Sequence, residues 1–202
     1  MSSMKKQLEF FFDFMSPFAY LAETQLGALI DKFGLDVRYV PLDLPVAKLA
    51  AGNTGPSNRQ VPAKLRYLTA DMQRWAKRYH LPPLVFPSNF ASERANRGLF
   101  YAIDKGQQRD YVHQMFQAVW GRGEDMTDES VLRRVAEGLG WSGDEFLAYT
   151  VGEGSAQRFA EANKETHERG VFGVPTMFVD GEMWWGNDRL QFVEEYLASQ
   201  SS

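Results

Sequence analysis

The order of the predicted secondary structure limits the fold of this chain more than any other feature of its sequence. The start of the chain predicts a buried aromatic strand over residues 8–14, a helix over residues 17–33 and a second strand over residues 36–43. Gly34 lies where a glycine commonly ends a helix. A strand, helix and strand in this order favour a parallel strand pair with a right-handed crossover.

Strands return only near the end of the chain, after a long helical block. Helices are predicted at residues 63–80, 91–106, 107–123, 127–140, 142–150 and 154–170. Two extended runs then flank Asp180-Gly181, a pair typical of a hairpin turn, and a last helix over residues 186–199 would be capped by Asn187 or Asp188. The distant strands share one mixed sheet only if the helical block loops out, and clefts form readily at such junctions.

The composition excludes several classes of function. Among 202 residues there is no cysteine, so any thiol chemistry needs a thiol that arrives with a ligand. His80, His113 and His167 are far apart in the sequence, and we predict no metal site. The net charge of −4 and the lack of a basic block argue against nucleic-acid binding.

The N-terminal apolar run raises the question of a signal peptide. Glu9 and Asp13 interrupt the run, so it lacks the uninterrupted apolar core of a signal peptide. No stretch of the sequence approaches 18 uncharged apolar residues, the length that predicts a membrane-spanning helix. We therefore expect a soluble, cytoplasmic protein with no membrane partner.

Ser16 and Pro17, in the stretch DFMSPFAYL, join the first strand to the first helix. Serine at the N-cap followed by proline is a common helix start, and the serine oxygen then accepts a bond from a free backbone N–H. The same position lies at the carboxyl end of a strand, where sheets containing parallel strands bind ligands. The partial positive charge of a helix N-terminus stabilises a thiolate there, and the hydroxyl can donate to it. Both interpretations remain open.

Three further stretches each allow a structural and a functional interpretation. Val174-Pro175 is either a strand-edge proline or a cis peptide that exposes the backbone of Val174 to a peptide-like ligand. GNTGPSNRQ, at residues 52–60, is either a solvated linker or, with Lys48, a carboxylate site formed by Asn58 and Arg59. MWWGNDR, at residues 183–189, provides core tryptophans and caps, or a carboxylate suited to a ligand's ammonium group.

Taken together and in order, five stretches carry a family resemblance: FFFDFMSPFAYLA, GNTGPSNR, DMQRWA, LVFPSNF and VFGVPTMFVDGEMWWGNDRL. They resemble the 2-hydroxychromene-2-carboxylate isomerase family, which is related to kappa-class glutathione transferases and to DsbA-like thioredoxin folds. The resemblance implies an α/β fold, in which a thioredoxin-like β-α-β / β-β-α domain is interrupted by an all-helical insertion. Residues 1–46 and 165–202 would form the glutathione-binding domain, and residues 47–164 the insertion.

The same resemblance implies roles for individual residues. Ser16 would hold the thiolate of glutathione, the implied cofactor, and Val174 before a cis Pro175 would pair with the glutathione backbone. The γ-glutamyl end would contact Trp185, Gly186, Asn187 and Asp188. The substrate carboxylate would lie near Lys48, Asn58 and Arg59. Phe90 and Ala91 match substrate-proximal positions, although Pro83 reads as a one-residue insertion shortly before them.

The implied reaction interconverts 2-hydroxychromene-2-carboxylate and trans-o-hydroxybenzylidenepyruvate in the breakdown of naphthalene-type aromatics. The substrate would therefore be a small aromatic carboxylate, and relatives suggest a homodimer. A kappa-like glutathione transferase acting on other electrophiles would share Ser16, Pro175 and the region of Asp188. A non-catalytic thioredoxin-like binding module is a further alternative, which predicts no activity that depends on glutathione.

Overall fold

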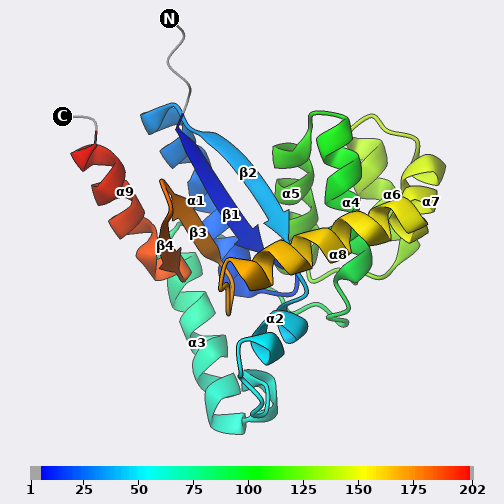
Figure 1. The fold of residues 1–202 in the computed structure, drawn as a ribbon. Coiled ribbons are helices and arrows are strands. Elements are labelled where there is room, and N and C mark those ends of the chain that lie inside the picture. Colours follow the sequence, from blue (N-terminus) through cyan, green and yellow to red (C-terminus); the bar gives the residue numbers. More distant parts are fainter. Residues whose placement is uncertain (1–5, 201–202) are drawn as a thin grey trace, which may run out of the picture.

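A four-stranded mixed sheet is the centre of the molecule (Figure 1). The computed structural model describes residues 6–200. The strands are β1 (Gln7–Phe12), β2 (Asp36–Pro41), β3 (Thr176–Val179) and β4 (Glu182–Trp185), in the order β2-β1-β3-β4. β1 and β2 are parallel, whereas β3 is antiparallel to both β1 and β4. The predicted parallel pair and the return of distant strands to the same sheet are confirmed.

The helices follow the predicted order, with one addition. They are α1 (Pro17–Phe33), α2 (Leu44–Ala50), α3 (Pro62–Arg78), α4 (Glu93–Asp104), α5 (Gln108–Phe116), α6 (Glu129–Gly138), α7 (Gly143–Val151), α8 (Glu153–Glu168) and α9 (Leu190–Ser199). α2 has no counterpart among the predicted helices. Among the described residues, no helix combines the length and the apolarity that crossing a bilayer requires.

Alternation along β1 explains how the sheet is covered on both faces. Phe10 and Phe12 point to one face and join the core beneath α1, where Phe12 packs 5.6 Å from Phe116 of α5 between ring centroids. Phe11 points to the other face, where its ring lies 5.4 Å from that of Phe178 and α8 adds Phe159. In Figure 1, α8 crosses in front of the sheet and α1 lies behind it.

The helical block shares a hydrophobic core with the sheet. Phe14, just after β1, lies 4.7 Å from Phe116 between ring centroids, and Tyr111 of α5 continues the contact to Trp141.

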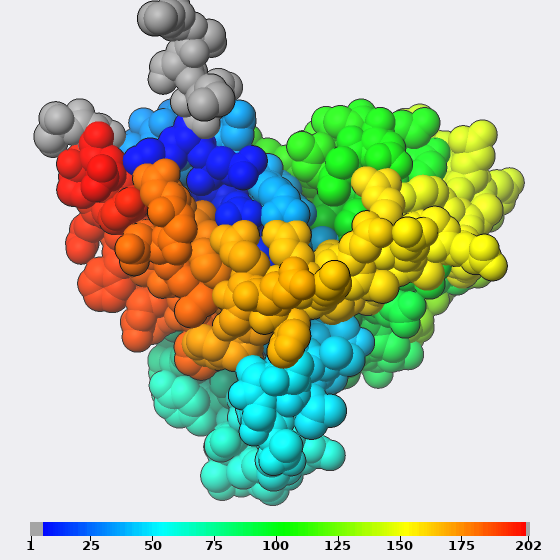
Figure 2. Space-filling model, viewed as in Figure 1, coloured from blue at the N-terminus to red at the C-terminus, as the bar shows by residue number. Residues whose placement is uncertain are grey.

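α8 runs across the domain boundary that was predicted between residues 164 and 165. The domain ranges, which include residues 1–5 and 201–202 outside the described part, stay a prediction. Figure 2 shows the segment from α2 to α3 as a projection at the lower end of the molecule.

Two local predictions near the end of the chain had different outcomes. The hairpin turn is confirmed, because Asp180 and Gly181 both have positive φ, at 53° and 87°, as a type I′ turn requires. The predicted caps of the last helix are wrong. Asn187 and Asp188 belong to a 3-10 turn, Asn187–Arg189, and the α-helix begins after it, with Arg189 at the N-cap.

Candidate functional site

Four segments of the chain meet where β1 and β2 end, an edge of the sheet that we call the site edge. Phe12 pairs with Pro41, so the loop into α1 lies beside the loop into α2. Because β3 is antiparallel to β1, its first residue, Thr176, pairs with Phe11 near the same edge. Trp185, the last residue of β4, pairs with Thr176. The topology therefore brings together the surroundings of Ser16, α2, Pro175 and Gly186.

Ser16 caps α1 at the site edge. Its Oγ accepts a hydrogen bond from the backbone N–H of Ala19 at 3.2 Å, and Pro17 occupies the first helical position. The residue is buried, with 5% of its surface exposed. A hydroxyl that accepts one bond still has its own hydrogen to donate, and the Ser16 hydroxyl donates it to no other described residue. The capping role therefore leaves the donor available to a ligand.

The buried Asp13 side chain connects several segments of the site edge through hydrogen bonds. Its fully buried carboxylate accepts hydrogen bonds from the backbone N–H of Met15 and of Leu44, at 3.1 and 3.0 Å, and from the amide of Asn96 at 3.1 Å. Burial raises the pKa of this carboxyl above its ordinary value. A hydrogen bond with Ser92 and the bonds from Leu44, Met15 and Asn96 oppose the shift. Asp13 thus connects the start of α1, the start of α2 and α4.

Two positive side chains, Lys48 and Arg59, lie near this edge, where the charge of Asp13 acts on Arg59 from beyond ion-pair distance. Lys48 of α2 and Arg59 of the short 3-10 turn Asn58–Gln60 form no ion pair within the described part of the chain. Burial lowers the pKa of Lys48, and the positive charges of Arg59 and Lys64 lower it further. The carbon of the Arg59 guanidinium lies 3.7 Å from the centroid of the Phe90 ring, a cation–π contact. Such an arrangement suits a negatively charged ligand that also carries an aromatic ring.

The other side of the site edge has buried backbone groups without hydrogen-bond partners in the described part of the chain, beside a half-exposed tryptophan. The Val174-Pro175 peptide is cis, as one of the two interpretations expected, and neither backbone group of Val174 bonds to another described residue. The Pro175 carbonyl accepts from the N–H of Gly186 at 2.9 Å. Trp185 is half exposed, and its ring meets that of Phe172 edge-on at 4.9 Å between centroids.

Asn187 and Asp188 follow directly. Asn187 is 4% exposed, and its Nδ2 has no hydrogen-bond partner. Its carbonyl accepts from the hydroxyl of Tyr79, at the end of α3, at 3.4 Å. Asp188 pairs with its neighbour Arg189 at 2.7 Å. A buried amide without a partner needs a hydrogen-bond acceptor, so a polar ligand group fits beside Asn187.

The family is decided by a match over almost the whole chain. Residues 7–198 match the model of the DSBA-like thioredoxin domain. A curated 2-hydroxychromene-2-carboxylate isomerase of Pseudomonas sp. (strain C18) is 46% identical over 187 residues, which is 93% of this chain and 88% of that protein. The chain belongs to the 2-hydroxychromene-2-carboxylate isomerase family, within the DSBA-like thioredoxin domains.

Two further comparisons place this isomerase-family chain among its relatives. A solved structure of a 2-hydroxychromene-2-carboxylate isomerase superposes with a TM-score of 0.93, at 45% identity, and covers 96% of each chain. Human glutathione S-transferase kappa 1 is 25% identical over 223 residues, which is 99% of this chain and 94% of that protein. The resemblance stated from the sequence, and the thioredoxin-like α/β fold that it implies, are confirmed.

Most of the predicted site residues form two groups at the site edge of this protein. One group contains Lys48, Arg59 and Phe90, and the other contains Val174, Pro175, Trp185, Gly186, Asn187 and Asp188. Asn58 begins its 3-10 turn in an exposed position, and Ala91 is exposed after Phe90. The roles of all these residues stay predictions.

Sequence reasoning missed Asp13 and Tyr79 as parts of the site. An acid directly after a buried aromatic strand is a signal that could have drawn attention to Asp13, since a buried carboxylate needs several donors. No comparable signal marks Tyr79, because its contact with Asn187 spans 108 residues of sequence.

Proposed function

We propose that the protein is a glutathione-dependent isomerase that interconverts 2-hydroxychromene-2-carboxylate and trans-o-hydroxybenzylidenepyruvate. The identity to curated isomerases over most of the chain supports the reaction, and the kappa relative, named as a glutathione S-transferase, supports the cofactor. The single observation that carries the mechanism is the Ser16 hydroxyl, which caps α1 through its oxygen and keeps its hydrogen to donate. The proposal includes a cytoplasmic homodimer; light scattering on the purified protein checks the dimer, and cell fractionation checks the location.

The residues at the site edge fit a glutathione molecule. The free backbone groups of Val174, before the cis Pro175, suit the peptide part of the tripeptide. The unpartnered Nδ2 of buried Asn187 suits an oxygen of the γ-glutamyl end. Trp185 and Gly186 would flank that end, and Asp188 would bind the ammonium group in competition with Arg189. Of these groups, the backbone of Val174 and the side-chain amide of Asn187 have hydrogen-bonding capacity left for a ligand.

Glutathione, when bound, would supply a thiolate nucleophile for reversible addition to the conjugated carbon of the ring-opened substrate, which would leave a single bond free to rotate until elimination restores the double bond. Ser16 would donate its hydroxyl hydrogen to the sulfur. The partial positive charge at the start of α1 would favour the thiolate over the thiol. Because the chain has no cysteine, no thiol of its own competes for this position.

Lys48, Asn58 and Arg59 would bind the substrate carboxylate and stabilise the enolate charge that develops while the bond rotates. Within the described residues neither Lys48 nor Arg59 forms an ion pair, which supports this role, since both cations remain available to an anionic ligand. Phe90, stacked on Arg59, and Ala91 would line the aromatic ring of the substrate. The same stacking holds the guanidinium plane in one orientation.

Replacement of Ser16 by alanine tests the proposal. The Ser16→Ala variant should lose at least about 100-fold in turnover, as expected for one lost donor at a reacting anion. It should lose only about 1 kcal/mol of stability, the usual cost of an N-cap. Ser142→Ala is the matched control, because Ser142 caps α7 through a 3.3 Å bond from the N–H of Glu145. That variant should lose similar stability and keep full turnover; equal turnover in both variants would reduce Ser16 to a cap.

Glutathione binding separates the isomerase from a non-catalytic binding module. At 100 times its dissociation constant, glutathione should stabilise the folded protein by about 2.7 kcal/mol, which a thermal shift measures. Conjugation of chlorodinitrobenzene, assayed beside hydroxychromene isomerisation, separates the isomerase from a transferase acting on other electrophiles. A thermal shift with efficient conjugation but no isomerisation would overturn the proposed substrate and keep the cofactor.

A further inference from the structure

A second polar pocket lies away from the site edge, between α1, β2 and α5. It has a volume of about 330 Å³, and Gly27, near the middle of α1, forms part of its wall. Gly27 lies 11 residues along the helix from Ser16, or about 16 Å at 1.5 Å per residue. The pocket is therefore separate from the proposed glutathione site, and the inference below does not depend on the proposed function.

Tyr39, in the wall of this pocket, provides a buried polar group without a partner among the described residues. Its ring packs edge-on against Phe10 and Phe12, with centroids 6.0 and 6.3 Å apart. The residue is 5% exposed, and its hydroxyl forms no hydrogen bond. A buried hydroxyl in this state destabilises the fold, so a group that bonds to it contributes favourably on binding.

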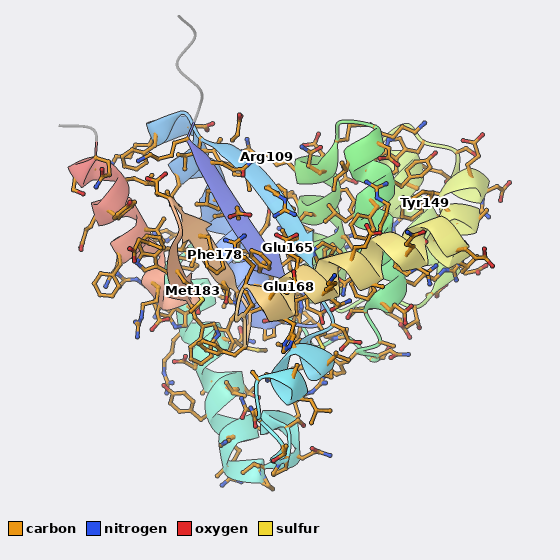
Figure 3. All side chains as sticks on the ribbon, viewed as in Figure 1. Arg109, Tyr149, Glu165, Glu168, Phe178 and Met183 are labelled. Atoms are coloured by element: carbon orange, nitrogen blue, oxygen red, sulfur yellow. The ribbon has the colours of Figure 1, made fainter. Side chains whose placement is uncertain are left out.

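Arg109 and Asp110, both in the first turn of α5, line the same pocket with opposite charges. Both residues are exposed, and neither side chain forms a hydrogen bond or an ion pair with another residue in the described part of the chain. A Cβ atom at position 27 would lie 2.9 Å from a guanidinium nitrogen of Arg109, so glycine there leaves room for the guanidinium. Figure 3 shows Arg109 near β2, on the side of the sheet that faces α5.

The remaining charged groups of the pocket form a pair. Glu23 of α1 is 5% exposed, and its carboxylate lies 3.3 Å from Nδ1 of His113. Burial and then the charge of Glu23 raise the pKa of Tyr39, Arg109 opposes the shift, and Asp110 adds to it; all four residues line the pocket. The described residues contain no cluster of three acids and histidines suited to a metal ion. The pocket therefore offers one free cation and one free anion to an organic ligand.

We propose that this pocket binds a small zwitterion that carries both a carboxylate and an ammonium group, as a free amino acid does. Arg109 binds the carboxylate through its guanidinium, and Asp110 binds the ammonium group. Tyr39 donates its hydroxyl hydrogen to the carboxylate or accepts from the ammonium group. A ligand with a single charge can pair with only one of Arg109 and Asp110. A carboxylate alone or an ammonium compound alone therefore binds more weakly than the zwitterion.

A series of ω-amino acids tests the ligand class on the intact protein. Glycine, β-alanine and γ-aminobutyrate, which differ only in the spacing of the two charges, are titrated beside acetate and methylammonium. At least one amino acid should give saturable amide chemical-shift changes at millimolar concentration, confined to α1 near Gly27 and to the first turn of α5. Acetate and methylammonium should bind at least about tenfold more weakly.

Variants assign the binding to the pocket. Tyr39→Phe keeps the packed ring and removes only the hydroxyl, so it should raise the melting temperature without ligand and weaken binding about tenfold. Arg109→Gln should weaken binding by a similar factor, and Arg66→Gln, at an exposed arginine of α3, should not change it. Wild-type affinity in both pocket variants would overturn the proposal. So would the absence of saturation by any amino acid, which would show that the pocket holds only water.

Discussion

Asp13 and Glu23 are the two acidic side chains that the described part of the chain buries, and they are partnered in different ways. Asp13 accepts from two backbone N–H groups and from the side-chain amide of Asn96. None of these donors changes its protonation state near neutral pH. Glu23 instead bonds to His113, whose protonation does change in that range. One carboxylate is held by fixed donors and the other by a partner that can lose its proton.

The difference matches the places where the two acids lie. Asp13 connects the start of α1, which carries Ser16, to the start of α2, which carries Lys48, so it keeps proposed catalytic groups in one geometry. Glu23 bonds to a His113 side chain that is half exposed, so water can replace the lost bond on the ring. Removal of Asp13 should therefore cost more than removal of Glu23.

The largest expected effect is that of Asp13→Ala. The change leaves the N–H of Leu44, the N–H of Met15 and the amide of Asn96 without their acceptor, and we expect a loss of about 3 kcal/mol from the free energy of unfolding. Glu23→Ala, the matched change, should cost about 1 kcal/mol, since the half-exposed His113 ring can bond to water instead. Urea denaturation of the two variants and the wild type measures both values, and equal losses would contradict the comparison.

The same pair of acids shows what the sequence could predict. The order of strands and helices along the chain, the hairpin at Asp180-Gly181 and the cap at Ser16 follow from local patterns, and the structure confirms them. The partners of Asp13 lie 31 and 83 residues away at Leu44 and Asn96, and no local pattern reports such contacts. The helix α2 was missed for another reason: its seven residues are too few for periodicity to be recognised.

The candidate site divides in the same way. Ser16 and Pro175 carried local signals, a cap before proline and a valine-proline pair before a strand, and both lie where those signals predicted. Arg59, in the 3-10 turn Asn58–Gln60, stacks on Phe90, in the loop before α4. Only the folded chain brings these two residues together. The pocket behind Tyr39 had no sequence signal, because it depends on how α5 packs against α1.

A smaller effect is expected when Asp13 is replaced by asparagine. Asp13→Asn turns one acceptor into a donor that faces N–H groups, with an expected loss of about 1–2 kcal/mol. Burial holds the pKa of Asp13 above its value of about 3.9 in the unfolded chain. The folded wild type therefore keeps a proton that the unfolded chain loses, and its stability relative to the variant should fall as pH rises above about 4. Denaturation at several pH values measures this difference, and a rise instead of a fall would contradict the buried acid's role.

The smallest effect is expected at the other acid, where Glu23→Gln should change the titration of His113. The hydrogen bond that Glu23 accepts from His113 and the negative charge of Glu23 raise the pKa of His113, and Asp110 adds to the shift. Burial and Arg109 oppose it. Without the Glu23 charge, the pKa should fall toward the ordinary value of about 6.5. NMR titration of the ring measures it, with the ring signal of His80, outside the pocket, as the internal reference.

The sign of the stability change follows from the same shift. A raised pKa in the fold stabilises the wild type below about pH 6.5, and this contribution disappears as pH rises through the folded value. Because the His113 side chain is 52% exposed, solvent screening limits the contribution to a fraction of 1 kcal/mol. Asp13→Asn should leave the His113 titration unchanged, since its carboxylate is not among the groups that act on this ring. A His113 titration that moved in Asp13→Asn but not in Glu23→Gln would show that the two acids do not act independently.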